Sequence, residues 1–175
     1  SIQFHQFVVL FFSPIHTGTN CDSGKYQSSN TLATQCAYCA VGKYFKTDAT
    51  PCDICAAGQI QISSTTANAQ CTTCTIGKFL VDAGIDPTEH DSTSDCKYCV
   101  AGTAFHTATT VCTTCLQGTY QASNNVLSVK CTECTNGRYL IDTATAAIEH
   151  DAEADCLFCV AGKQFVSKTT VCQIC

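Results

Sequence analysis

The chain has 175 residues, of which 17 are cysteines and 13% are charged, and its formal net charge is −5 at pH 7. Cysteine at this density is typical of a disulfide scaffold, and large aliphatic residues are too sparse for a thick hydrophobic core. With nine Lys and Arg residues and no basic cluster, the composition excludes a nucleic-acid-binding surface.

Residues 1–20 differ from the rest of the chain because they contain a short apolar run. The run consists of Phe7, Val8, Val9, Leu10, Phe11 and Phe12. It is too short to span a bilayer, so we expect no membrane span in this segment. Two interpretations stay open: the centre of a signal peptide, or a strand that packs on the first module or on a neighbouring subunit. We treat the run as a candidate assembly strand.

From Cys21 onward the chain is a cysteine repeat. After the unpaired Cys21, every cysteine belongs to a CxxC pair, and the pairs begin at residues 36, 52, 71, 96, 112, 131, 156 and 172. The intervals of 16, 19 and 25 residues recur, which predicts a superrepeat of 60 residues made of three modules. The predicted units are a partial first module (21–35), superrepeat 1 (36–95), superrepeat 2 (96–155) and the start of superrepeat 3 (156–175). Because the chain begins with Ser1 and stops directly after a CxxC motif, we expect it to be part of a longer protein.

A glycine follows the second cysteine of each module at a fixed offset, as Gly24, Gly42 and Gly102 do. Glycine at a constant position predicts a turn with positive φ or a close backbone approach. An aromatic residue two or three positions later, as in Gly24-Lys25-Tyr26, is expected to begin a short strand and to pack on the sulfur bridge. The segments between the motifs lack helical periodicity and predict loops with short β-hairpin arms.

CxxC pairs at these intervals have two chemical interpretations, zinc sites and disulfides. Two pairs about 15–20 residues apart can supply four thiolates to a tetrahedral zinc ion. Zinc sites use the pairs two at a time, however, and would leave Cys21 without a partner. An uninterrupted series favours bridges from the second cysteine of one pair to the first cysteine of the next, whereas bridges within a CxxC would leave the long loops open. We therefore expect no metal centre, and an oxidising, extracellular location.

The regular spacing predicts eight bridges. They are Cys21–Cys36, Cys39–Cys52, Cys55–Cys71, Cys74–Cys96, Cys99–Cys112, Cys115–Cys131, Cys134–Cys156 and Cys159–Cys172, with Cys175 bonded beyond the end of the chain. The predicted fold class is a small disulfide-rich fold, mostly coil with short β-hairpins, in which one-disulfide modules stack into an elongated rod.

The longest loop of each superrepeat is acidic and contains Glu-His-Asp, at residues 89–91 and 149–151. Its carboxylates are candidate Ca²⁺ ligands, or else they cap the backbone of a solvated turn. The candidate ligands are Glu89, Asp91, Asp95, Glu149, Asp151 and Asp155. Threonine is frequent between the motifs, which makes O-linked glycans a candidate modification, while the sequence contains no sequon for N-linked glycans.

The module Cys21-Asp-Ser-Gly24-Lys-Tyr26, followed by Cys36-Ala-Tyr-Cys39, resembles the ephrin-receptor-like and tumour necrosis factor receptor cysteine-rich repeats. The long Thr- and Ala-rich array is also similar to the surface (immobilization) antigens of ciliates and other large protist surface proteins. The resemblance covers residues 21–175 and implies an ectodomain, a protective coat or a stalk-like fibre.

Among these functions, the sequence favours a structural one. Nothing in it resembles a nucleophile elbow, a phosphate-binding glycine loop or HExxH, and eight CxxC pairs without helices do not fit an oxidoreductase, so we expect no enzymatic activity. The leading hypothesis is an extracellular repeat protein that self-associates into a filament or a cell-surface coat. The alternative is a cysteine-rich ectodomain that binds a protein or glycan ligand.

Overall fold

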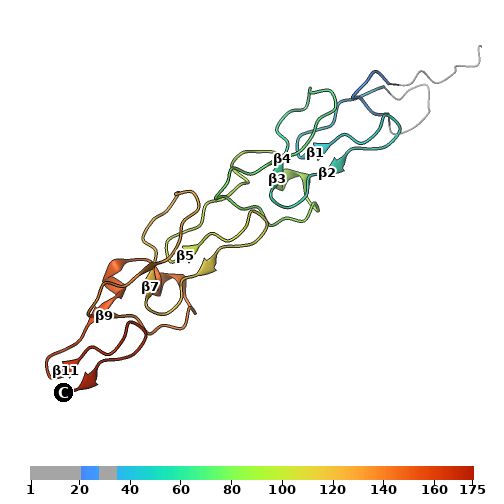
Figure 1. The fold of residues 1–175 in the computed structure, drawn as a ribbon. Helices are drawn as coiled ribbons and strands as arrows, with labels where there is room; N and C mark the ends of the chain where they lie inside the picture. The colour runs from blue at the N-terminus through green and yellow to red at the C-terminus, as the bar shows by residue number, and fades with distance from the viewer. Residues whose placement is uncertain (1–20, 28–34) are drawn as a thin grey trace, which may run out of the picture.

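A computed structural model describes residues 21–27 and 35–175 of the chain. These residues form an elongated rod, with the modules following one another from one end to the other in sequence order (Figure 1). The predicted fold class is therefore confirmed: the rod is a disulfide-rich stack, mostly coil, with short antiparallel hairpins. The candidate assembly strand at residues 7–12 lies outside the described residues.

Each hairpin is built by the cysteine motif itself. After the glycine turn, β1 (Lys43–Tyr44) pairs antiparallel with β2 (Asp53–Ile54), whose two residues are the middle of the next CxxC, and Lys43 lies opposite Ile54. The backbone N–H of Cys55 then donates to the carbonyl of Gly42, at 2.9 Å. The CxxC spacing therefore provides the return strand of one module and the first cysteine of the next bridge.

The same hairpin recurs along the rod. The further pairs are β3 (Gln59–Ile60) with β4 (Thr72–Thr73), β5 (Thr103–Ala104) with β6 (Thr113–Thr114), β7 (Thr119–Tyr120) with β8 (Thr132–Glu133), β9 (Arg138–Tyr139) with β10 (Leu157–Phe158), and β11 (Lys163–Gln164) with β12 (Gln173–Ile174). Two isolated bridges, Tyr26 with Ala37 and Phe79 with Lys97, take the same place in their modules.

Among the described residues, the helical elements are three single turns of 3₁₀-helix, all in the acidic loops: η1 (Pro87–Glu89), η2 (Ala147–His150) and η3 (Glu153–Asp155). Proline is the first residue of η1, and the carboxylate of Asp86 accepts a hydrogen bond from the Thr88 N–H at 2.9 Å. Asp86 therefore acts as an N-cap, a common role of aspartate before a helical turn.

The interior of the rod is made largely of sulfur. Most bridged cysteines are buried, and they are joined by a few aliphatic residues such as Ile60, Leu80 and Leu140. Aromatic rings pack on this interior as the sequence predicts: Tyr26 lies against the cluster that contains the Cys39–Cys52 bridge, in the following module. The thin core agrees with the composition, in which large apolar residues are sparse.

Contacts between modules extend beyond nearest neighbours. A Cβ built on Gly102 (φ 81°) would lie 2.6 Å from the carbonyl carbon of Ala147, two modules along the rod. A Cβ on Gly42 (φ 76°) would lie 2.9 Å from the carbonyl carbon of Pro87, again two modules away. Each loop therefore folds back over two modules, and only glycine fits beneath it.

Candidate functional site

For a rod of this kind, the candidate functional site is the set of bonds that hold one module to the next, and the disulfide ladder is the first of them. The structure contains eight bridges, with Cα–Cα distances of 5.5–5.7 Å and sequence separations of 13–22 residues. They join the same cysteines as the pairs inferred from the spacing. Among the described residues Cys175 is the free cysteine, and it is exposed.

Because each bridge closes a loop of 13–22 residues, it restricts the unfolded chain. Chain-entropy arguments assign about 3 kcal/mol to a loop of this length. The bridges also use the cysteines that a zinc site would need. Within residues 21–27 and 35–175, no group of three or more His, Cys, Asp and Glu side chains is placed to hold a metal ion.

A backbone hydrogen bond accompanies every junction between consecutive bridged modules. The residue three positions after each module glycine donates its N–H to a carbonyl in the next module's loop, at 2.8–2.9 Å. The seven bonds run from Gln27 to Asp48, Phe45 to Ala69, Gln61 to His90, Leu80 to Ala108, Phe105 to Val129, Gln121 to His150 and Leu140 to Lys168. Successive modules are therefore held in one repeated orientation.

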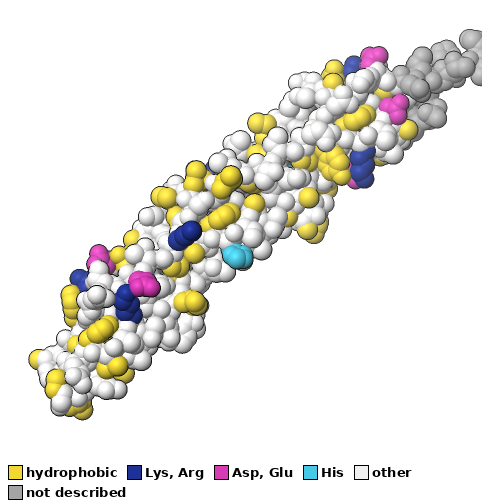
Figure 2. Space-filling model, in the orientation of Figure 1, with side chains coloured by type: hydrophobic (Ala, Val, Ile, Leu, Met, Phe, Trp, Pro, Cys, Tyr) yellow, Lys and Arg dark blue, Asp and Glu magenta, His cyan; other side chains and the backbone are white. Residues whose placement is uncertain are grey.

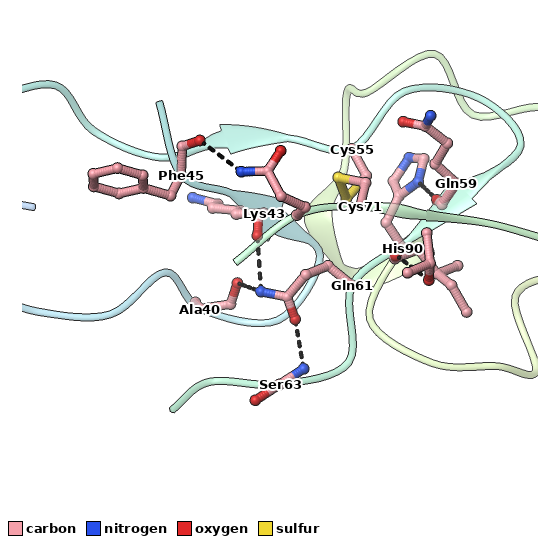
Figure 3. The surroundings of a disulfide bond; sticks show 12 residues. Ala40, Lys43, Phe45, Cys55, Gln59, Gln61, Ser63, Cys71 and His90 are labelled. Carbon is pink, nitrogen blue, oxygen red and sulfur yellow. Dashed lines mark hydrogen bonds between the residues drawn. A yellow bond between two sulfur atoms is a disulfide. The ribbon is translucent and has the colours of Figure 1, made fainter. Parts of the chain in front are cut away.

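Two buried glutamines strengthen particular junctions. Gln61 is 4% exposed, and its side-chain amide donates to the carbonyls of Lys43 at 2.9 Å and Ala40 at 3.4 Å, both in the preceding module (Figure 3). Its side-chain oxygen accepts from the Ser63 N–H. Gln121 makes the equivalent bonds to Thr103, at 3.0 Å, and to Val100, at 3.2 Å.

Two fully buried histidines hold the following junctions. His90 is 0% exposed, and its Nδ1 lies 2.7 Å from the carbonyl oxygen of Gln59, in the preceding module (Figure 3). Its Nε2 lies 2.8 Å from Oδ1 of Asp82. The backbone carbonyl of His90 accepts the N–H of Gln61. Gly42 in turn donates its N–H to the carbonyl of Gln61, so three consecutive modules are connected.

The second histidine repeats this geometry. Nδ1 of His150 lies 2.8 Å from the carbonyl oxygen of Thr119, and Nε2 lies 2.9 Å from Oδ1 of Asp142. His150 is also 0% exposed, and its carbonyl accepts the N–H of Gln121. We use the name histidine joints for these two sites. Each consists of a histidine–aspartate pair, His90–Asp82 or His150–Asp142, together with the glutamine N–H that donates to the histidine carbonyl.

The carboxylates of the histidine joints are held in the ionised form. Hydrogen bonding from His90, together with the backbone N–H of Ile85, lowers the pKa of Asp82 to about 2. The pKa of Asp142 is lowered as well, chiefly through the hydrogen bond from His150 and with a contribution from the hydroxyl and N–H of Thr145. Both carboxylates therefore carry a negative charge against a buried ring.

The candidate Ca²⁺ ligands do not form a metal site in the structure. Asp95 accepts the N–H of Ser92 at 2.8 Å, and Asp155 accepts the N–H of Ala152 at 2.8 Å, so each satisfies its own turn. Glu89 and Glu149 are exposed, and Asp91 and Asp151 are half-buried. The capping interpretation of these acidic loops fits the hydrogen bonds. Within the described residues, these carboxylates form no group that could hold a metal ion.

Sequence reasoning did not identify the glutamines or the histidine joints. His90 and His150 were noted only as part of a recurring Glu-His-Asp, and Gln61 and Gln121 were not singled out. The available signal was the recurrence of Asp82, Gln61 and His90 as Asp142, Gln121 and His150, each 60 residues later.

Comparison with known proteins identifies one family model. Residues 102–151 match the family described as tyrosine-protein kinase ephrin type A/B receptor-like, a segment that contains Gln121 and His150. No curated protein matches the sequence. The chain is thus a CxxC-rich repeat protein, and its resemblance to the ephrin-receptor-like repeats is confirmed over this segment. The match and the many disulfides together indicate a cysteine-rich domain of the extracellular type.

The helices of the rod are far too short to cross a bilayer, and no candidate membrane span occurs in the part of the chain that the structure describes.

Proposed function

We propose that the chain is a structural extracellular protein that associates with further copies in a filament or a cell-surface coat. The observation that carries the proposal is the uniformity of the rod: the same hydrogen bond recurs at seven junctions and the same hairpin in successive modules. A rod built from repeated contacts offers equivalent surfaces at regular intervals, which suits regular assembly.

The surface of the rod supports lateral association. Val100 and Val160 occupy equivalent positions in the motif Cys-Val-Ala-Gly and are 59% and 64% exposed, and Val111 and Val171 form a second exposed pair. Hydrophobic side chains occur along the whole visible face, with few charges between them (Figure 2). Weakly charged sides of this composition repel one another little and bury apolar area when they meet.

We further propose that the protein is not an enzyme. Thiol–disulfide exchange needs an attacking thiolate, whereas the cysteines of the described modules are bonded between motifs, with Cys175 as the exception. Each histidine of the histidine joints contacts a carbonyl and a carboxylate, which orients the ring for a structural role rather than towards a nucleophile.

Sedimentation velocity and negative-stain microscopy of the oxidised chain test the proposed assembly. We expect concentration-dependent association into elongated particles, and replacing Val100 and Val160 by Asp should weaken it, while replacing both by Thr should have a smaller effect. A chain that stays monomeric at every accessible concentration would contradict the proposal. Deleting residues 1–12 tests the candidate assembly strand separately: unchanged association would exclude its participation.

The receptor-like family match at residues 102–151 favours one alternative, an ectodomain that binds a protein or glycan ligand. Monomeric rods that bind a glycan or protein saturably, with one ligand per chain, would support this alternative over assembly. Immobilised full-length chain, probed with glycan arrays and with purified surface proteins, provides that measurement.

O-linked glycans are a further part of the proposal. Exposed turns carry paired hydroxyl groups, with Thr47 and Thr50 at 2.7 Å, Thr107 and Thr110 at 2.7 Å, and Ser167 and Thr170 at 2.8 Å between the oxygens. Glycans on these turns would thicken and solubilise the rod. Intact mass of the secreted protein before and after removal of O-linked sugars tests this, and an unmodified mass would reject it.

A further inference from the structure

The buried histidines have hydrogen-bond partners that demand a particular protonation state. Nδ1 of His90 faces the carbonyl oxygen of Gln59, which can only accept a hydrogen bond. The Nδ1 atom must therefore carry a hydrogen. In neutral imidazole the other nitrogen is then an acceptor, and it would need a donor opposite it.

The partner of Nε2 cannot be that donor. Oδ1 of Asp82 already accepts the backbone N–H groups of Gly84 and Ile85, both at 2.9 Å, so it has no room for a proton directed at the ring. Nε2 must then donate as well. The arrangement is satisfied when His90 is an imidazolium and Asp82 is a carboxylate, a charge-assisted pair buried between two modules.

The second histidine joint leads to the same result. Nδ1 of His150 faces the carbonyl of Thr119, and both oxygens of Asp142 already accept bonds from Thr145, the N–H at 3.2 Å on Oδ1 and the hydroxyl at 2.9 Å on Oδ2. The geometry therefore recurs with different neighbours. Because a doubly protonated ring is required at both of these equivalent junctions, it is a property of the repeat and not of one loop.

The surroundings of the rings contain acidic groups and neutral amides. Facing His90 are Asp82, in direct contact, and Asp86, which interacts with it through charge, while β3 contributes the backbone of Gln59 and the neighbouring Gln61 contributes its N–H. Around His150, the ionisable contact is Asp142, with Glu149 and Asp151 adjacent in the chain.

We propose that the two histidine joints are pH-sensitive connections, closed when the ring is doubly protonated and weakened when it loses a proton. On deprotonation, a ring nitrogen without hydrogen faces either the Asp82 carboxylate or the Gln59 carbonyl, and a buried bond is lost. The His90 carbonyl lies on the same residue, so movement of the ring also loosens the bond from Gln61. The rod is therefore held more firmly under mildly acidic conditions than under alkaline ones.

Amide hydrogen exchange on the oxidised, full chain tests the proposal between pH 5 and 8, after correction for the intrinsic pH dependence of exchange. The amides of Gln61 and Gln121 report on the histidine joints, and the amide of Phe105, which makes the same bond to Val129 without a histidine, is the internal control. We expect protection of Gln61 and Gln121 to fall about tenfold to a hundredfold as pH rises, and protection of Phe105 to stay constant.

Variants and ring spectra complete the test. His90→Gln should remove the pH dependence at Gln61, whereas His106→Gln, at an exposed histidine, should leave it unchanged. If His90→Gln does not fold, nitrogen spectra of the wild-type rings decide: at pH 6, His90 and His150 should each show two nitrogen-bound hydrogens. A single nitrogen-bound hydrogen on these rings, or equal pH dependence at Gln61 and Phe105, would overturn the proposal.

Discussion

The contact between each glycine turn and the loop two modules along can be measured with a matched pair of substitutions. Gly102 and Gly137 both have positive φ, 81° and 87°. A Cβ at Gly102 would overlap the backbone of Ala147, whereas a Cβ at Gly137 would have no described atom within 4 Å. Replacing each by alanine therefore separates backbone strain from the stacking contact.

The expected magnitudes follow from these two contributions. Backbone strain at positive φ should cost both variants about 1–2 kcal/mol of unfolding free energy. Gly102→Ala should lose about a further 1–3 kcal/mol, because the backbone at Ala147 must shift to accommodate the added methyl group. Gly42→Ala, beneath Pro87, should resemble Gly102→Ala.

Urea titrations of the oxidised chain, followed by tyrosine fluorescence, provide these free energies. Amide exchange at Leu140, three residues after Gly137 and in the module that covers Gly102, can locate the effect along the rod. If Gly137→Ala proved as destabilising as Gly102→Ala, the contact across two modules would contribute nothing to stability, and the reasoning would be wrong.

Three other predictions follow from the junctions. Gln61→Ala should reduce the unfolding free energy by about 1–3 kcal/mol, because the carbonyls of Lys43 and Ala40, which are partly buried, lose their donor. The exposed Gln70→Ala should have little effect in the same urea titration. The pKa of Asp82 is lowered to about 2, so its contribution to stability is present above the ordinary pKa of 3.8 and is lost as pH falls towards 2. Asp82→Asn should therefore remove this acid-dependent decrease in the melting temperature. An unchanged dependence of the melting temperature on acid pH would count against the ion pair. Replacing Cys74 and Cys96 together by Ser should lower the unfolding free energy by about 3 kcal/mol. This loss is roughly half a kcal/mol larger than that expected for the Cys99–Cys112 bridge, whose cysteines are 13 positions apart. A melting temperature equal to that of the wild type would refute the estimate.

The pH predictions for Asp82 and His90 together define a range in which the histidine joint is closed. Towards low pH the carboxylate becomes protonated, and towards high pH the proposed imidazolium loses its hydrogen. Stability measured across the whole range should therefore pass through a maximum between the two titrations. Asp82→Asn and His90→Gln should each remove one flank of this maximum, which allows the two titrations to be distinguished.

The parts of the fold that sequence could predict are those governed by covalent spacing. The series of CxxC pairs indicated which cysteines bond, because each loop length allows closure to the next motif, and glycine at a constant offset indicated a turn with positive φ, which Gly42 and Gly102 adopt. Neither inference depended on how the modules pack. The 60-residue superrepeat is a prediction of the same kind.

The histidine joints could not be predicted because they depend on packing between modules. Residue types alone grouped Glu89, Asp91 and Asp95 as cation ligands, but local turns direct Asp95 to the Ser92 N–H and leave Glu89 exposed. The ring of His90 instead meets the carbonyl of Gln59, 31 residues away. That meeting is set by the orientation of one module on the next, which sequence spacing does not specify.

The position of the bridges also determines how the rod would respond to a pulling force. The shortest covalent path does not follow the backbone: it crosses a bridge, with 5.5–5.7 Å between the Cα atoms, and then runs through one CxxC before the next crossing. Three extended residues add about 10 Å, so each module can lengthen to only about 16 Å while its sulfur bonds persist. The segment inside each loop, between cysteines that are 13–22 positions apart in the sequence, carries no tension. In an oxidising medium the molecule is a nearly inextensible tether, and a reductant would release its hidden length.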